Sequence, residues 1–149
     1  MEDVPASASP IDQISAEASF TLLSRDAAAV LIDVRTHAEW SYVGVPDLED
    51  IGKAPVLQEW QTYPDQTTVT DFGATLARRL EAQGVGRDDP LLFLCRSGVR
   101  SLSAAQAMRE IGYTRCLNVE HGFEGPPDAD RHRGGVGGWK ADGLPWRQT

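Results

Sequence analysis

The chain has 149 residues, 41% hydrophobic and 24% charged, a composition typical of one folded domain rather than of a disordered segment. Its formal net charge of −8, from 22 acidic and 14 basic side chains, argues against general binding to nucleic acid or to an acidic membrane surface. No apolar run approaches the ~20 residues that a membrane-spanning helix needs, which argues against a membrane protein.

The N-terminus, Met1 to Pro10, is acidic and rich in small side chains, and it lacks the basic and apolar pattern of a signal peptide. We therefore expect a loose tail over residues 1–13, a folded domain over residues 14–149 and a cytoplasmic location. The two cysteines, Cys95 and Cys116, lie in different settings, and no His or Cys cluster has metal-ligand spacing. We expect neither a disulfide nor a metal site.

The first half of the chain alternates short apolar segments with stretches rich in glycine and proline. Ser15 precedes an amphipathic run and predicts a helix start, because serine side chains cap helices. A compact apolar run before Asp33 is typical of a buried strand. In chain order this half predicts a helix after Ser15, a strand over residues 29–32, a helical turn over 37–42, a loop over 44–54 and a second strand over 56–60.

The second half of the chain shows clearer periodicity. Phe72, Leu76 and Leu80 recur every four residues and predict a helix that Gly84 closes. In chain order this half predicts that helix from residue 70, a strand over 91–94, a helix over 101–111, a strand over 115–119 and a glycine-rich segment over 122–138. The last segment, residues 139–146, is expected to dock back onto the domain.

Strands that alternate with helices predict an α/β fold in which a central parallel β-sheet is flanked by helices on both faces. In such sheets the ligand lies beyond the carboxyl ends of the strands. Three segments follow predicted strands and should meet there: residues 33–35, the loop that begins at Cys95, and residues 120–123.

Cys95 lies between the apolar run over residues 91–94 and the helical pattern that starts at Ser101. A helix start presents unpaired N–H groups and a positive dipole end, which favour a thiolate and can hold an anion. Gly98 permits the backbone angles of a tight loop, and the neighbouring arginines add positive charge. The expected site is Cys95 as the nucleophile, surrounded by an anion-binding loop of Arg96, Ser97, Gly98, Val99, Arg100 and Ser101.

Other polar residues carry weaker signals. Asp33 either hydrogen-bonds near the cysteine loop or caps the turn after its strand, and both interpretations stay open. Asp33 and Arg35 are candidates for supporting roles, although Arg35 lies four residues before Glu39, a spacing that favours a local ion pair. The basic cluster at residues 131–133 either gathers anions or is a solvated patch. Cys116 is interpreted as a small buried hydrophobe.

The segments Leu31 to Arg35, Leu94 to Ser101 and Gly138 to Lys140 resemble a single-domain rhodanese in their order and spacing, and the similarity extends from Ile14 to Trp146. The resemblance implies a sulfurtransferase without a metal or organic cofactor. In that family the cysteine, here Cys95, takes a sulfane sulfur from a small anionic donor such as thiosulfate and becomes a persulfide. The sulfur then passes to a thiophilic acceptor, which is cyanide in the usual assay and a thiol or a protein in the cell.

The resemblance leaves two other functions open. Rhodanese-like domains also serve as non-catalytic interaction or regulatory modules, although these usually lack the cysteine or an intact loop. Phosphatases and arsenate reductases are the third class; tyrosine-phosphatase-like enzymes use the spacing C-x5-R, whereas Cys95 and Arg100 give C-x4-R and predict a loop too tight for phosphate. The chain departs from the common family pattern over residues 43–64, so the second strand and the choice of acceptor are not settled by the resemblance.

Overall fold

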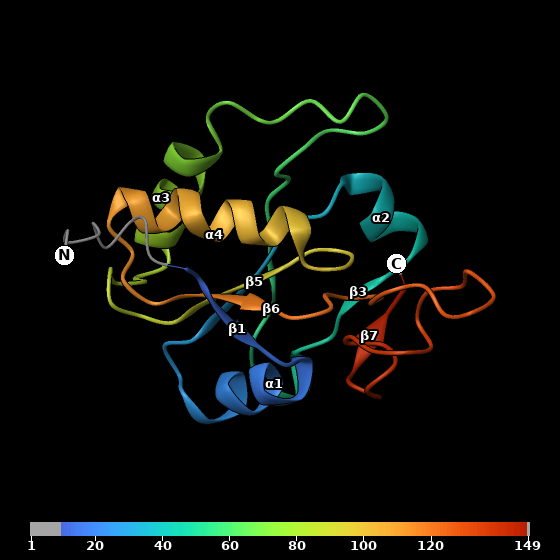
Figure 1. The fold of residues 1–149 in the computed structure, drawn as a ribbon. Coiled ribbons are helices and arrows are strands. Elements are labelled where there is room, and N and C mark those ends of the chain that lie inside the picture. The colour runs from blue at the N-terminus through green and yellow to red at the C-terminus, as the bar shows by residue number, and fades with distance from the viewer. Residues whose placement is uncertain (1–9, 149) are drawn as a thin grey trace, which may run out of the picture.

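The computed structural model describes residues 10–148, in which helices cover a parallel β-sheet (Figure 1). In chain order its elements are β1 Asp12–Ile14, α1 Ala16–Arg25, β2 Val30–Asp33, α2 His37–Tyr42, β3 Val45–Pro46, the 3-10 helix η2 Glu49–Ile51, β4 Val56–Leu57, α3 Phe72–Ala82, β5 Leu91–Leu94, α4 Val99–Ile111, β6 Cys116–Val119 and β7 Trp146–Arg147. Within residues 10–148, none of the helices has the length and apolar character that crossing a membrane requires.

The main sheet has five parallel strands in the order β1-β6-β5-β2-β4. Strand β5 pairs with a strand on each side, and all four of its residues are buried, as expected for the centre of a sheet covered on both faces. The strands predicted over residues 29–32, 91–94 and 115–119 are confirmed to within one residue at each end. Because the strands are parallel, their carboxyl ends meet at one edge.

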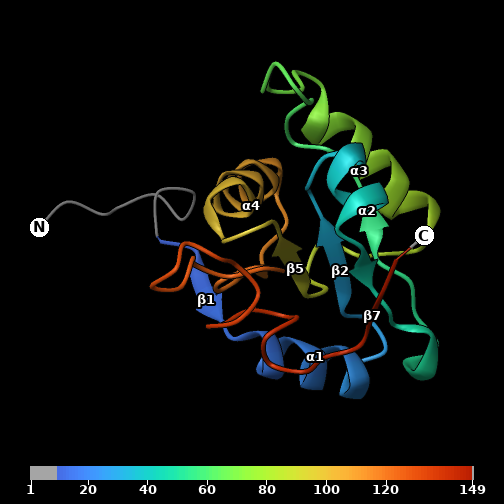
Figure 2. The same cartoon turned by 90° about the vertical axis from the view of Figure 1, so that its right-hand side faces the viewer.

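Helices lie on both faces of the sheet, as predicted (Figure 2). Leu91 and Phe93 of β5 belong to the core that contains residues of α3 and α4, whereas Leu92 and Leu94 belong to the core that contains residues of α1. This alternation follows from the two-residue period of a strand. Among the described residues, α1 is the one long helix on the second face, and Phe123 and Trp139 of the C-terminal segment complete the core there.

The structure corrects the expected N-terminal tail. Residues 1–9 lie outside the described part of the chain, but Asp12–Ile14 forms the edge strand β1, which pairs in parallel with β6. Ile11 is buried, and the amide of Glu120 donates a hydrogen bond to the carbonyl of Ile14. The domain therefore begins before residue 14. A three-residue strand with two exposed residues has no periodicity that the sequence could reveal.

The C-terminal segment docks back onto the domain, as predicted. Strand β7 pairs antiparallel with β3, and these two-residue strands were not predicted. Trp139 is fully buried, and its indole Nε1 donates a hydrogen bond to the carbonyl of Pro145.

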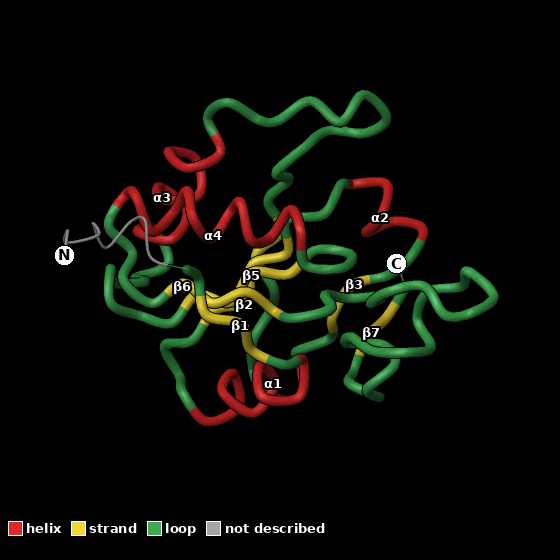
Figure 3. The backbone as a smooth tube through the Cα atoms, in the orientation of Figure 1, coloured by secondary structure: helices red, strands yellow, loops and turns green. Residues whose placement is uncertain are grey.

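Two long loops leave the sheet, over residues 58–71 and 120–145 (Figure 3). The second strand predicted over residues 56–60 is shorter than expected, because only Val56 and Leu57 pair with β2. The amides of Gln58 and Trp60 still bond to carbonyls at the end of β2, so the chain stays beside that strand as it enters the first loop. Helix α4 begins at Val99, two residues earlier than predicted, directly after the turn at Gly98.

Candidate functional site

Cys95 is buried at the carboxyl end of β5, and two hydrogen-bond donors approach its sulfur. The Gly98 amide donates a hydrogen bond to Cys95 Sγ over 3.1 Å, and Ser101 Oγ lies 3.2 Å from the same sulfur. Gly98 has a φ of +108°, in the left-handed region that favours glycine, and its turn leads directly into α4. The first amides of a helix have no partner within the helix. The expected loop between a strand and a helix start is therefore present around the thiol.

A second segment, residues 122–125, binds the loop from the side away from the sulfur, and we call it the backing segment. The Phe123 amide donates to the carbonyl of Cys95 over 2.8 Å, and the amides of Glu124 and Gly125 donate to the carbonyl of Arg96 over 3.0 and 3.1 Å. At Gly122 a Cβ atom would lie 2.3 Å from the Cys95 carbonyl oxygen, so only glycine lets the segment approach this closely. These hydrogen bonds hold the carbonyls of Cys95 and Arg96 away from the sulfur, and this orientation favours turning the amides of the loop towards it. The expected meeting of residues 120–123 with the cysteine loop is confirmed.

Asp33 and Arg35 form a buried ion pair at the end of strand β2. Both side chains are fully buried; Arg35 Nη2 lies 2.8 Å from Asp33 Oδ2, and Arg35 Nε donates to both carboxylate oxygens. The guanidinium also donates to the carbonyl of Gly44 and lies 4.2 Å from the ring centroid of Phe123. Asp33 Oδ1 accepts from the Arg35 amide as well, which supports the turn-capping interpretation of Asp33. The pair joins β2 to the segments that flank the site.

The predicted ion pair between Arg35 and Glu39 is wrong. Glu39 instead accepts two hydrogen bonds from Arg100, with Nη1–Oε1 and Nη2–Oε2 distances of 2.6 and 2.9 Å. Glu39 also completes a capping box with Thr36 at the start of α2. Burial raises the pKa of Glu39, but the hydrogen bonds and charge of Arg100, with help from Thr36 and Arg35, outweigh it and hold the pKa below its ordinary value. At the pocket, the carboxylate of Glu39 therefore offsets the positive charge of Arg100.

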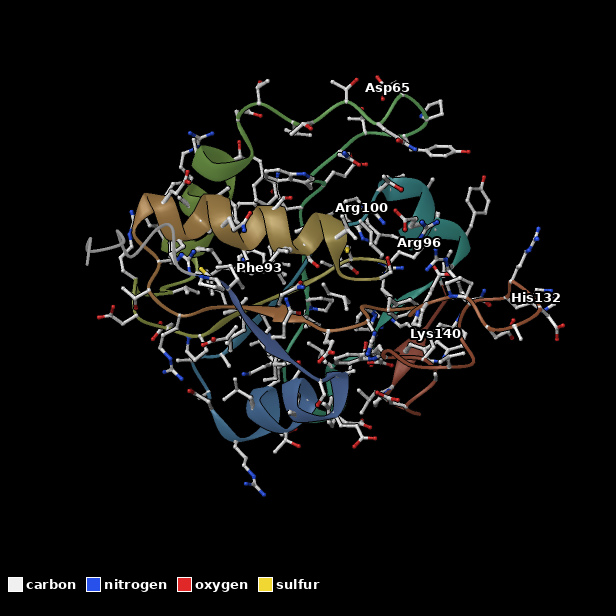
Figure 4. The ribbon with its side chains drawn as sticks, in the orientation of Figure 1. Asp65, Phe93, Arg96, Arg100, His132 and Lys140 are labelled. Carbon is white, nitrogen blue, oxygen red and sulfur yellow. The ribbon has the colours of Figure 1, made fainter. Side chains whose placement is uncertain are left out.

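A pocket of about 720 Å³ opens beside the thiol, within the range of sites that hold drug-sized ligands. The predicted residues that line it are Cys95, Arg96, Ser97, Val99 and Arg100. The lining residues that were not predicted are Thr36, Ala38, Glu39, Val43, Gln61, Thr62, Tyr63, Gln66 and Glu124. Figure 4 shows Arg96 and Arg100 between α2 and the start of α4. The atypical stretch over residues 43–64 therefore supplies part of the pocket wall.

The basic cluster at residues 131–133 contains one pocket residue, Arg133, and two exposed residues, Arg131 and His132. Arg133 lines the pocket, and its Nη1 donates to the carbonyl of Gly125 over 2.7 Å. Arg131 and His132 are exposed, and His132 lies at the edge of the molecule, away from Arg96 and Arg100 (Figure 4). Arg133 was not singled out from the sequence as a pocket residue, because no local pattern separates it from its two neighbours.

Asn118 is a site residue that the sequence analysis missed. It lies on β6, is 2% exposed, and its Oδ1 atom is 2.5 Å from Ser101 Oγ. Its Nδ2 atom donates to the carbonyl of Gly98 and to Oε1 of Gln13, each over 3.0 Å. The signal was one amide side chain in an otherwise apolar strand, since a buried polar group needs hydrogen-bond partners.

Cys116 is a buried free thiol away from the site, as predicted. Its sulfur donates to the carbonyl of Tyr113 over 3.4 Å. Burial raises the pKa of Cys116 to about 12, although the charge of Arg109 acts in the opposite direction. Over residues 10–148, no three His, Cys, Asp or Glu side chains are grouped so that they could hold a metal ion.

Comparison with known proteins gives consistent results. The family described as rhodanese-like domain matches residues 18–125. An uncharacterized protein of Rickettsia conorii is 34% identical over 137 residues, which span 92% of this chain and 98% of that protein. A crystal structure from M. tuberculosis has a TM-score of 0.84 at 46% identity and covers 95% of this chain and 100% of that chain. A polysulfide-sulfur transferase homodimer from Wolinella succinogenes has a TM-score of 0.59 at 22% identity over 97% of this chain and 83% of that one, a likeness of fold.

Proposed function

The chain belongs to the rhodanese-like domain family, and from this premise we propose that it is a sulfurtransferase that works through a persulfide on Cys95. It takes a sulfane sulfur from thiosulfate or from a persulfide donor and passes it to a thiophilic acceptor. The observation that carries the proposal is the placement of Cys95 Sγ, which accepts a hydrogen bond from the Gly98 amide at the start of α4 and borders an open pocket. A reducing compartment such as the cytoplasm would keep this thiol free.

The reaction consists of two displacements at sulfur. In the first, the Cys95 thiolate attacks the outer sulfur of thiosulfate; a new S–S bond forms, the old one breaks, and sulfite leaves with the bonding pair. In the second, the acceptor attacks the terminal sulfur of the persulfide and restores the Cys95 thiolate. With cyanide as acceptor the product is thiocyanate. Neither step requires a proton from the protein once the thiolate exists, so the site needs no general base.

The loop supplies what the charged intermediate requires. A terminal persulfide sulfur carries a negative charge, and several N–H donors aimed at one point stabilise such an anion. The Gly98 amide donates to Cys95 Sγ, and helix α4, whose first amides have no partner within the helix, begins at the next residue. The backing segment at Gly122 supports their direction, because it binds the loop carbonyls on the other side.

The charges of the pocket favour an anionic donor. Three arginines line the pocket together with two glutamates, on a protein whose net charge is −8. Glu39 balances Arg100, so Arg96 and Arg133 are the cations best placed to hold a donor anion. The pocket is also much larger than thiosulfate, which supports a place for an organic persulfide donor or a larger thiol acceptor.

The test is an assay of the purified chain with thiosulfate and cyanide, beside a separate assay with an aryl phosphate. We expect thiocyanate and no phosphate release. Intact mass after thiosulfate alone should increase by one sulfur atom, and cyanide should remove it. Phosphate release without thiocyanate would favour a phosphatase, and no reaction in either assay with an unchanged mass would favour a non-catalytic module.

A further inference from the structure

We propose that the Ser101 hydroxyl is a two-position hydrogen-bond donor that alternates between Cys95 and Asn118, and that Asn118 is the positioning residue that controls this alternation. Its role in turnover rests on the proposed sulfur transfer. The alternation itself is a property of the thiol and can be measured without any sulfur donor.

The geometry places one hydroxyl between two acceptors. Ser101 Oγ lies 2.5 Å from Asn118 Oδ1 and 3.2 Å from Cys95 Sγ. A serine hydroxyl has a single proton, so it can donate to only one of these atoms at a time. Ser101 is fully buried and Asn118 is 2% exposed, so bulk water does not supply a substitute partner to either side chain.

The orientation of the Asn118 amide follows from its other contacts. Nδ2 lies 3.0 Å from the carbonyl oxygen of Gly98, which can only accept a hydrogen bond, and 3.0 Å from Oε1 of Gln13. The NH2 group must therefore face Gly98, and the oxygen must face Ser101. Since Oδ1 is an acceptor only, it draws the Ser101 proton towards itself.

The preferred position of the proton then depends on the state of Cys95. While Cys95 is a thiol, it can donate its own proton to Ser101 Oγ, and Ser101 donates to Asn118. In the thiolate, Cys95 Sγ carries the full charge and competes with Asn118 for the Ser101 proton. In the persulfide the charge lies on the terminal sulfur, and Ser101 returns to Asn118. The hydroxyl rotates at each half-reaction, and no O–H bond breaks.

The charged groups near the sulfur include two ion pairs, and Arg96, Arg133 and Glu124 line the same pocket as Cys95. Arg100 of α4 is paired with Glu39 of α2. Arg35, after β2, is paired with Asp33. The neighbours from β1 and β6 are the neutral amides Gln13 and Asn118. Among residues 10–148, the groups within hydrogen-bond distance of Cys95 Sγ are the Gly98 amide and the Ser101 hydroxyl, so these two respond directly to its ionisation.

A double-mutant cycle tests the proposal. Wild type, Ser101→Ala, Asn118→Leu and the double variant are compared, all with Cys116→Ala so that Cys95 is the only thiol. The readout is the rate at which iodoacetamide alkylates Cys95, measured by intact mass across pH without a sulfur donor. Ser101→Ala should slow alkylation at neutral pH about tenfold, because the thiolate loses a hydrogen bond to a charged group.

Asn118→Leu should act in the opposite direction. It removes the competing acceptor and should speed alkylation about threefold, the scale of one hydrogen bond between neutral groups. In the Ser101→Ala background, the same change should have no effect. Ser101→Thr, which keeps the hydroxyl, should restore most of the wild-type rate. If Asn118→Leu does not fold by its thermal unfolding profile, Asn118→Ala replaces it in the cycle.

Two outcomes would overturn the proposal. An equal effect of the Asn118 change with and without Ser101 would mean that Asn118 acts through the Gly98 carbonyl instead. A wild-type pH profile for Ser101→Ala would mean that the hydroxyl does not respond to the thiolate. A chain that follows the predicted cycle yet forms no thiocyanate would refute the proposed function and leave the alternation standing.

Discussion

Glu39 of α2 and Arg100 of α4 are joined by two hydrogen bonds of 2.6 and 2.9 Å at the pocket, although 61 positions separate them in the chain. The pair connects the short helix α2 to the start of α4, the helix that follows Cys95. It also lowers the net positive charge of the pocket, because the carboxylate offsets the guanidinium.

Changing either partner should therefore shift thiosulfate binding in opposite directions. Arg100→Ala should raise the KM for thiosulfate, whereas Glu39→Gln should lower it about threefold, because the pocket loses a negative charge that repels the donor. Steady-state kinetics with varied thiosulfate give both values. Glu81→Gln, on an exposed side chain of α3 that pairs with Arg87, is the control and should leave the KM unchanged. A higher KM for Glu39→Gln would contradict this account.

The same ion pair predicts a loss of stability in acid. Arg100 holds the pKa of Glu39 below its ordinary value despite burial, so the unfolded chain binds a proton more readily than the folded one. The contribution of the pair is then fully present above the unfolded pKa of about 4.3 and is lost as the pH falls towards the lower folded pKa. Thermal unfolding between pH 3 and pH 7 should show a smaller acid-induced decrease in Tm for Glu39→Gln than for wild type. Equal decreases would show that other carboxylates dominate.

The two cysteines should respond differently to removal. Cys95→Ser should abolish thiocyanate formation and leave the fold intact, because the change is small and lies at a loop. Cys116→Ala should retain activity, since burial raises the pKa of this thiol to about 12 and keeps it protonated at neutral pH. It should cost about 1 kcal/mol of stability through the lost buried volume. Persistent activity in Cys95→Ser would transfer the role to Cys116.

Two glycines with similar backbone angles offer a matched test of the backing segment. Gly122 and Gly52 have φ values of +60° and +71°, but an added Cβ would lie 2.3 Å from the Cys95 carbonyl oxygen at Gly122 and would meet nothing within 4 Å at Gly52. Gly52→Ala should cost about 1 kcal/mol from left-handed strain and leave activity unchanged. Gly122→Ala should cost more and should also reduce sulfur transfer, because the segment must move off the loop. Equal effects on both Tm and kcat would refute a supporting role for this contact.

The buried pair of Asp33 and Arg35 should behave as a unit. Removal of one partner leaves an uncompensated buried charge and should cost about 3–5 kcal/mol, whereas replacement of both by apolar residues should cost less than the sum. Denaturant unfolding of Asp33→Leu, Arg35→Met and the double variant measures this coupling. Additive losses would mean that the two side chains stabilise the fold separately.

The parts of the fold that the sequence predicted are those with strong local patterns. The run over residues 91–94 is apolar at every position and became the central strand, and Phe72, Leu76 and Leu80 formed the buried side of α3. Strands β3 and β7 have two residues each, too few for a pattern to be seen. They form because the chain is held by tertiary contacts, which local sequence does not encode.

In the candidate site, too, the residues with a local sequence pattern could be predicted, and those brought together by tertiary contacts could not. The loop from Cys95 to Ser101 could be identified because its residues are consecutive and lie between a strand and a helix. The partner of Arg100 could not, since no local pattern relates it to Glu39. The pocket wall at residues 61–66 belongs to a long loop without periodicity, and only the fold brings it near the thiol. Asn118 could have been predicted from the sequence, because a single amide side chain in an apolar strand needs hydrogen-bond partners when it is buried.

The hydrogen bonds that join Arg96 to Glu124 and Gly125 have one more consequence. Arg96 and Glu124 both line the pocket, so the pocket wall and the loop after Cys95 share the same stretch of main chain. A ligand that displaces this wall should also displace the hydrogen bonds from Glu124 and Gly125 to Arg96, which support the loop that carries the Gly98 amide. We therefore expect a ligand that fills the cavity also to change the reactivity of the Cys95 thiol.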